Sequence, residues 1–119
     1  MQSAAADILE NKNKTEKINK MQITSDKNAD VLTVSIQGSV DTVTAPELDN
    51  FLQANQQNIQ TLILDFSAVD YISSAGLRVI MMANQNMEDC DGTLKICNVN
   101  EDVMEVFEMT GFDSLLNFE

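Results

Sequence analysis

The fold of this chain is decided by residues 62–80, which read LILDFSAVDYISSAGLRVI. The stretch begins inside a continuous apolar run, Thr61–Phe66, which is typical of a central strand covered on both faces. A helix over residues 74–87 is expected to follow, after a short loop that holds Asp65, Ser67 and Asp70. A strand, a loop and a helix in this order indicate one unit of an α/β fold.

The segments on either side repeat the alternation of strands and helices. Two strands are predicted at the start, one around Met21 and Ile23 and one over 31–37, joined by a polar turn over 25–30. Later segments predict a strand over 94–99, a third helix capped by Asn98 or Asn100 and ended by Gly111, and a short strand over 115–118. With the helix described next, the order β-β-α-β-α-β-α-β predicts one α/β domain with a mixed sheet.

The first helix has the spacing of a capping box at its start. In Thr44-Ala45-Pro46-Glu47, the Thr44 hydroxyl is expected to accept from the amide of Glu47, whose side chain would reach back to the Thr44 amide. Pro46 suits the first turn, where its missing N–H leaves no hydrogen bond unmade. The sequence therefore predicts a helix that begins at this motif and continues through Ala54.

Composition and charge exclude several classes of function. The 119 residues suffice for one domain, and no apolar run is long enough to span a bilayer. Nineteen acidic residues against seven basic ones give a net charge of −12, which disfavours nucleic acid and anionic membranes as partners. The chain has no histidine, so Ser–His–Asp, Cys–His and His-ligated zinc chemistry are excluded. Two cysteines and no secretory signal indicate a reducing, cytoplasmic location.

Residues 1–20 differ in charge from the rest of the chain. Four lysines against three acidic residues make this segment +1, whereas residues 21–119, with three basic and sixteen acidic residues, are −13. We interpret residues 1–20 as a mobile or partly helical N-terminal extension and place the start of the domain at Met21.

Two serines and a glycine open the second predicted helix. Serine is a preferred N-cap, which is a sufficient structural reason for Ser73 or Ser74. Gly76 needs a separate reason, because glycine in a helix costs about 1 kcal/mol relative to alanine. Either a close approach by a partner or another backbone, or tight packing onto the sheet, would supply that reason.

The motif from Asp65 to Ile80 resembles the signature of the STAS domain of bacterial anti-sigma factor antagonists. Residues 38–48, GSVDTVTAPEL, are similar to a second conserved segment of that family, and Val103–Phe112 is similar to its closing helix and glycine exit. The three matches occur in the family's order across residues 21–119. The resemblance implies a STAS fold, with a mixed sheet of about four to five strands and three to four helices mainly on one side.

The resemblance also implies a function by partner switching. In that family the unmodified domain binds an anti-sigma factor that is also a serine kinase, and phosphorylation of a serine at the start of the second helix releases it. The matching position is Ser74, and Ser73, which stands where the family commonly has aspartate, is the alternative acceptor. The implied partner-binding residues are Asp41, Thr42, Asp70, Ser73, Ser74, Gly76, Leu77 and Arg78.

The same resemblance implies that the protein is a kinase substrate and not an enzyme. ATP and magnesium would belong to the partner, a phosphatase would act on the phosphorylated form, and the domain itself would need no cofactor and no metal. A phosphate at a helix N-terminus is stabilised by free amides and the helix dipole, so the modification should alter binding and not the fold. Arg78, one turn later, would pair with that phosphate or stay solvated.

Other functions of an α/β signalling domain stay open. One is a STAS regulatory or scaffold module of a non-transcriptional pathway, with weak nucleotide binding, although the chain has no phosphate-binding glycine loop. Another is an aspartyl-phosphate receiver with Asp65 at the strand end. Asp65 and Asp70 would also suit a metal or an acid–base pair, or serve only as turn formers.

Overall fold

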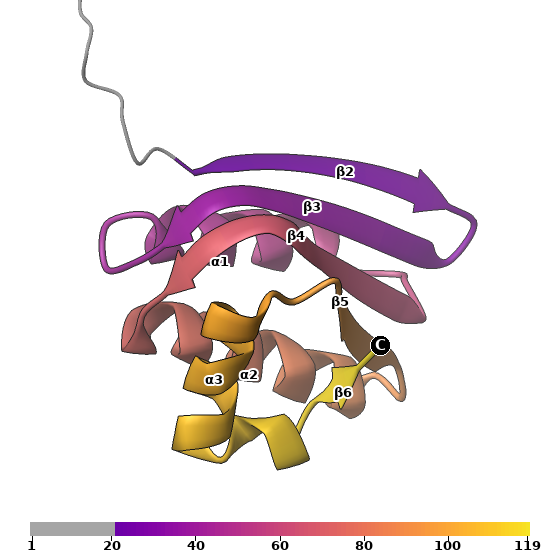
Figure 1. Cartoon of the computed structure of the whole chain (residues 1–119). Coiled ribbons are helices and arrows are strands. Elements are labelled where there is room, and N and C mark those ends of the chain that lie inside the picture. Colours follow the sequence, from indigo (N-terminus) through magenta and orange to yellow (C-terminus); the bar gives the residue numbers. More distant parts are fainter. Residues whose placement is uncertain (1–20) are drawn as a thin grey trace, which may run out of the picture.

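The computed structural model describes residues 21–119, which form a five-stranded mixed sheet with helices on one face (Figure 1). The elements are β2 (Gln22–Asn28), β3 (Val31–Val40), α1 (Ala45–Asn55), β4 (Thr61–Ile72), α2 (Ser74–Asp89), β5 (Thr93–Cys97), α3 (Glu101–Thr110), a 3₁₀ turn (Phe112–Ser114) and β6 (Asn117–Phe118).

The strand order in the sheet is β2-β3-β4-β5-β6. β2 is antiparallel to β3, and the other neighbouring strands are parallel, so the predicted fold class is confirmed. The predicted extension, residues 1–20, lies outside the described residues.

The core lies between the sheet and the helices. On β3, Leu32, Val34 and Ile36 are buried, whereas the alternate residues Thr33 and Ser35 are only partly buried. The same alternation continues on β4 and β5, and the three helices cover the buried face (Figure 1). Burying one large apolar side chain contributes roughly 1.5–3 kcal/mol, so this alternation fixes which face of the sheet receives the helices.

Three strands are longer than the sequence pattern predicts. β3 continues past residue 37 to Val40. β2 continues to Asn28, so the predicted turn over 25–30 is wrong, and the chain reverses only at residues 29–30. The predicted loop after Phe66 is also wrong, because β4 continues to Ile72. Two register shifts against β3 each place an extra residue in β4, so its polar residues fit while the pairing continues.

The predicted capping box does not form. Thr44 has helical backbone angles, and its hydroxyl donates to the Ser39 carbonyl at 2.7 Å and accepts from the Asp41 N–H at 2.9 Å. The Asp41 carboxylate instead accepts from the N–H groups of Val43 and Thr44, at 2.9 and 3.0 Å. A tight turn therefore precedes α1, with Asp41 in the role that the pattern assigns to Thr44.

These hydrogen bonds hold the pKa of Asp41 below its usual value, with the Thr44 N–H as the largest cause. Because the pKa is lower in the folded state, the ionised carboxylate adds stability above the unfolded-state pKa. That contribution is lost as the pH falls through the folded-state pKa.

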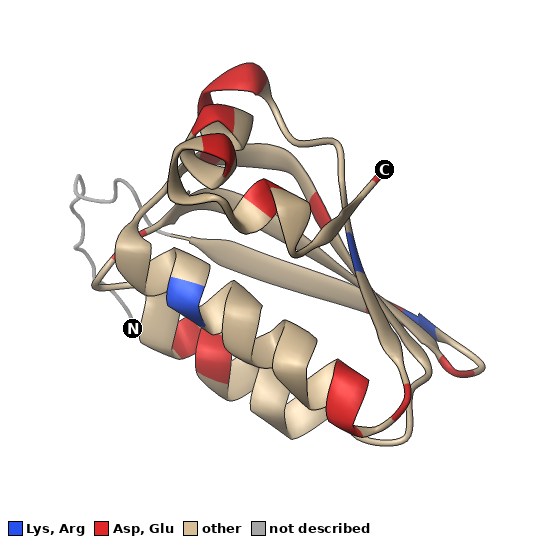
Figure 2. Cartoon of the chain, turned by 90° about the horizontal axis from the view of Figure 1, so that it is seen from below, with Lys and Arg blue, Asp and Glu red and all other residues tan. Residues whose placement is uncertain are grey.

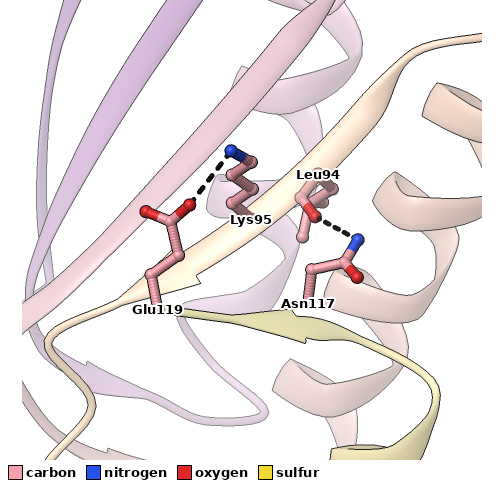
Figure 3. Close-up of polar contacts among 4 residues, drawn as sticks. All are labelled: Leu94, Lys95, Asn117 and Glu119. Carbon is pink, nitrogen blue, oxygen red and sulfur yellow. Dashed lines mark hydrogen bonds and ion pairs between the residues drawn. The ribbon is translucent and has the colours of Figure 1, made fainter.

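The C-terminus closes the far edge of the sheet. Asn117 Nδ2 donates to the Leu94 carbonyl at 3.2 Å, and Lys95 Nζ lies 3.0 Å from Glu119 Oε2 (Figure 3). Both contacts join the last residues to β5, and the predicted short final strand is confirmed as β6.

Gly76 is buried where α2 begins, and the structure shows why a side chain is absent there. A Cβ at this position would lie 2.8 Å from the Val40 carbonyl oxygen and 2.8 Å from the side chains of Val40 and Ile72. Both explanations within the domain that the sequence left open are observed: the backbone of β3 approaches closely, and the helix packs tightly onto the sheet.

We expect Gly76→Ala to destabilise the domain. Overpacking costs about 1–3 kcal/mol, and the higher helix propensity of alanine returns up to about 1 kcal/mol, so the net loss should be about 1–2 kcal/mol in urea unfolding. Ser74→Ala, an exposed change in the same turn, should shift stability by less than about 0.5 kcal/mol. An unchanged urea midpoint for Gly76→Ala would show that α2 can move away from β3 without a loss of stability.

We expect Asp41→Ala to lower stability by about 1 kcal/mol at pH 7, as loss of a side-chain cap does. The difference from the unmodified protein should narrow below about pH 4, because protonation weakens the same hydrogen bonds. Asp26→Ala, which removes an exposed carboxylate on β2, is the control for the loss of one acidic side chain. Urea unfolding at several pH values measures the free energy of unfolding of both variants. A stability difference between Asp41→Ala and the unmodified protein that widens in acid would contradict the role given to Asp41.

Candidate functional site

The carboxyl ends of β3 and β4 and the start of α2 meet at one end of the sheet. The Ser73 N–H donates to the Val40 carbonyl at 2.8 Å, which joins the β4–α2 junction to the end of β3. Asp41 follows Val40 directly, so the turn before α1 lies beside the two serines. The residues that the sequence analysis selected from 38–48 and 62–80 therefore come together at this end.

Ser73 and Ser74 have different local environments. Ser73 is the N-cap of α2 in extended conformation, and its Oγ accepts from the Gly76 N–H at 3.3 Å. Ser74 is the first helical residue, is exposed, and makes no side-chain hydrogen bond within residues 21–119. Of the two hydroxyls, Ser74 Oγ is therefore the more exposed one and has no hydrogen bond to another described residue.

The remaining predicted site residues divide into exposed and buried groups. Thr42 and Asp70 are exposed, and Asp70 Oδ1 accepts from the Ser39 hydroxyl at 2.8 Å. Arg78 is exposed one turn after Ser74, with no ion pair among the described residues. Gly76 is buried, as is Leu77, which is only 3% exposed. These last two residues shape the start of α2 and offer almost no surface to a partner.

The sequence analysis missed two exposed apolar side chains at this end. Val43 is 82% exposed because the turn around Asp41 directs the backbone N–H groups inward, and Tyr71, beside Ser39 in the register, is 52% exposed. The exposure of Val43 could have been suspected from the sequence, because this valine stands among turn-forming polar residues. We call the surface formed by residues 41–43, 70–71, 74 and 78 the helix-start surface.

Acidic residues dominate this end of the molecule. α1 and α2 begin here, directly after the parallel strands β3 and β4 (Figure 1). Acids in a first turn are favoured by the helix dipole. The acidic residues at this end are Asp41, Glu47 and Asp70, and Arg78 on α2 is basic. Over the described domain as a whole, Asp and Glu are far more frequent than Lys and Arg (Figure 2).

The polar groups at this end are serine and threonine hydroxyls, carboxylates and one guanidinium. No group of three or more His, Cys, Asp or Glu residues within 21–119 has the arrangement of a metal site. Asp65, the alternative candidate, accepts from the Ser67 N–H and from Asn98 Nδ2, at 3.0 and 3.1 Å, and these bonds lower its pKa. Asp65 lies within β4, where its carboxylate joins the first register shift of that strand to Asn98, directly after β5. No helix among the described residues is long and apolar enough to cross a membrane.

Comparisons with known proteins agree with this architecture. BtrV of Bordetella bronchiseptica, a candidate anti-sigma factor antagonist, is 36% identical over 96 residues, covering 80% of this chain and 83% of that protein. The crystal structure of an anti-sigma factor antagonist from Mycobacterium paratuberculosis superposes with a TM-score of 0.75 at 23% identity, covering 84% and 86% of the two chains.

A further solved structure is that of the Bacillus cell fate determinant SpoIIAA in its phosphorylated form. It has a TM-score of 0.66 at 14% identity, covering 82% of this chain and 91% of that one. At such identity the likeness shows the fold alone. The family model of the STAS domain matches residues 22–119, so the chain belongs to the STAS domain family.

Proposed function

We propose that this protein is an anti-sigma factor antagonist whose binding is controlled by phosphorylation of Ser74. Its unmodified form binds an anti-sigma factor with serine kinase activity, the kinase phosphorylates Ser74, and the modified form dissociates until a phosphatase restores it. The observation that carries the proposal is the free, exposed Ser74 Oγ at the first position of α2. Ser73 Oγ, in contrast, already accepts the Gly76 N–H.

The fold is suited to carry a phosphate at Ser74. The first turn of a helix has amides without helical partners, and the helix dipole favours an anion there by roughly 0.5–2 kcal/mol. Arg78, four residues later on the same helix face, is available for a charge-assisted bond to the phosphate. The phosphorylated domain is therefore expected to keep its structure.

The partner interface would respond differently. Phosphorylation adds nearly two negative charges to a surface that already holds Asp41 and Asp70. A docked partner would have to desolvate that charge or be repelled by it, which should cost several kcal/mol. At 1.4 kcal/mol per tenfold, the affinity should fall roughly a hundredfold or more.

In this proposal the chain is a substrate and a ligand, and it is not an enzyme. ATP and magnesium act on the partner's side, so no cofactor is assigned to the STAS domain. Two comparisons support the proposal: BtrV carries the name of a candidate anti-sigma factor antagonist, and SpoIIAA, which shares the fold, has been solved in a phosphorylated form.

We expect three baits to distinguish partner switching from a constitutive scaffold. The unmodified protein and Ser74→Ala should retain a serine kinase from host lysate, identified by mass spectrometry, whereas Ser74→Asp should lose it. Retention of the same partner by all three baits would favour a scaffold module. Capture of no such kinase by any bait would count against the proposed partner.

With the captured kinase and ATP, phosphorylation should occur on Ser74 and not on Ser73. Ser73→Ala loses an N-cap, which costs about 1 kcal/mol of stability, but it should still be phosphorylated. Ser74→Ala should incorporate no phosphate. Peptide mass spectrometry measures the site, and phosphate on Ser73 in the unmodified protein would refute the assignment.

Val43 and Tyr71 should act as apolar anchors for the partner. Val43→Ser and Tyr71→Ala should each weaken binding at least about tenfold, as loss of an interface hot spot does, while changing stability by less than about 1 kcal/mol. Met109, 79% exposed at the opposite end of α3, gives the matched control Met109→Ala, which should bind normally. Equal affinities for all three variants in calorimetry would remove these residues from the interface.

A further inference from the structure

A basic segment immediately precedes the described domain. Residues 12–20, KNKTEKINK, contain four lysines and one glutamate, a net charge of +3 in nine residues. The segment lies outside residues 22–119, which the STAS family model matches.

The structure shows where this segment joins the domain. Because β2 is antiparallel to β3, with Gln22 beside Gln37, β2 begins near the end where β3 finishes at Val40. Met21 is buried there at 2% exposure. One peptide unit spans about 3.8 Å between Cα atoms, so Lys20 is held close to this end of the sheet. The basic segment is therefore attached at the end that carries the helix-start surface.

The charges of the domain are complementary to those of the segment. Residues 21–119 have a net charge of −13, and Asp41, Glu47 and Asp70 outnumber Arg78 at the helix-start end. The two lysines of this part of the chain are elsewhere: Lys27 lies beside the β2–β3 turn, and Lys95 pairs with Glu119 on β5. The exposed Val43 and Tyr71 offer apolar contacts to Ile18, which the lysines flank.

From this complementarity we infer that residues 12–20 dock on the helix-start surface of their own domain. The lysines lie against Asp41 and Asp70, and Ile18 lies against the apolar pair Val43 and Tyr71. Nine residues span at most roughly 30 Å, so the segment can cover this end but not the whole sheet. Tethering gives a local concentration of roughly millimolar order, enough to populate a weak, salt-sensitive contact.

Docking would regulate the site, and this consequence rests on the proposed function. The segment occupies the surface that the anti-sigma factor would need, so it competes with that partner. Phosphorylation of Ser74 adds negative charge and strengthens the docking, which helps to keep the partner away. The segment is thus an internal competitor of the partner, and its affinity for the helix-start surface increases when Ser74 is phosphorylated.

The test uses the full chain with a nitroxide label on Asn13→Cys, in a Cys90→Ser, Cys97→Ala background. Paramagnetic broadening of amide signals is measured by NMR at low salt and at about 0.5 M salt, where charges are screened beyond about 4 Å. A matched variant replaces the four lysines, 12, 14, 17 and 20, by glutamine. A second control, Lys27→Gln, removes a lysine at the opposite end of the sheet.

Docking predicts broadening of at least about half of the signal at residues 41–44 and 70–74, reduced by salt and abolished in the four-glutamine variant but not in Lys27→Gln. Broadening that persists without the lysines would reflect the tether alone and would overturn the inference. Broadening centred elsewhere, or none at these residues, would overturn it as well.

The regulatory consequence has its own readout. The four-glutamine variant should bind the captured anti-sigma factor about two- to fivefold more tightly than the unmodified chain, as expected for release of a weak internal competitor. Equal or weaker binding would refute competition. If no anti-sigma factor binds either protein, the proposed function fails, and the NMR result still decides whether the segment docks.

Discussion

The close contact of α2 with the end of β3 is the constraint on which the other features depend. Gly76 lets the first turn of α2 approach so closely that an added Cβ would lie 2.8 Å from the Val40 carbonyl oxygen. That same oxygen accepts the Ser73 N–H at 2.8 Å, so the entrance to α2 is fixed by backbone to backbone. Because Ser73 is held as the cap, Ser74 becomes the first helical residue, with its hydroxyl in solvent.

This arrangement separates stability from recognition among adjacent residues. Ser73, Gly76 and Leu77 form the buried joint between helix and sheet, whereas Ser74 and Arg78 occupy the outer side of the same turns. The turn before α1 is divided in the same way: Asp41 binds backbone amides while Val43 extends outward. The modification proposed for Ser74 would therefore change the outer surface and leave this joint undisturbed.

The fold was largely predictable from periodicity, and the local turn chemistry was not. Alternating apolar residues on β3 and the run at Thr61–Phe66 predicted the sheet correctly, because burial of one face determines the register. The capping box around Thr44 was predicted wrongly, since pattern alone cannot tell that the hydroxyl is used by Ser39 and Asp41. The strand extension to Ile72 was missed because bulges let polar residues remain in a strand.

The candidate site was only partly accessible from sequence, for a related reason. Family resemblance selected Ser74 together with Gly76 and Leu77 as partner-binding residues. Resemblance cannot distinguish a residue that supports a surface from one that is exposed on it. Gly76 and Leu77 are buried, so they support the surface, whereas Ser74 is exposed on it. The exposure of Val43 follows from the turn that the Asp41 carboxylate forms with the N–H groups of Val43 and Thr44. A hydrophobic periodicity cannot predict such hydrogen bonds. The charge at this end has local causes: Asp41 accepts from backbone amides before α1, Glu47 lies in the first turn of α1, where the helix dipole favours an acid, and the first turn of α2 has no acid. This end of the sheet therefore carries an excess of acids before any modification, so the proposed basic segment and the proposed phosphate would change its charge in opposite directions.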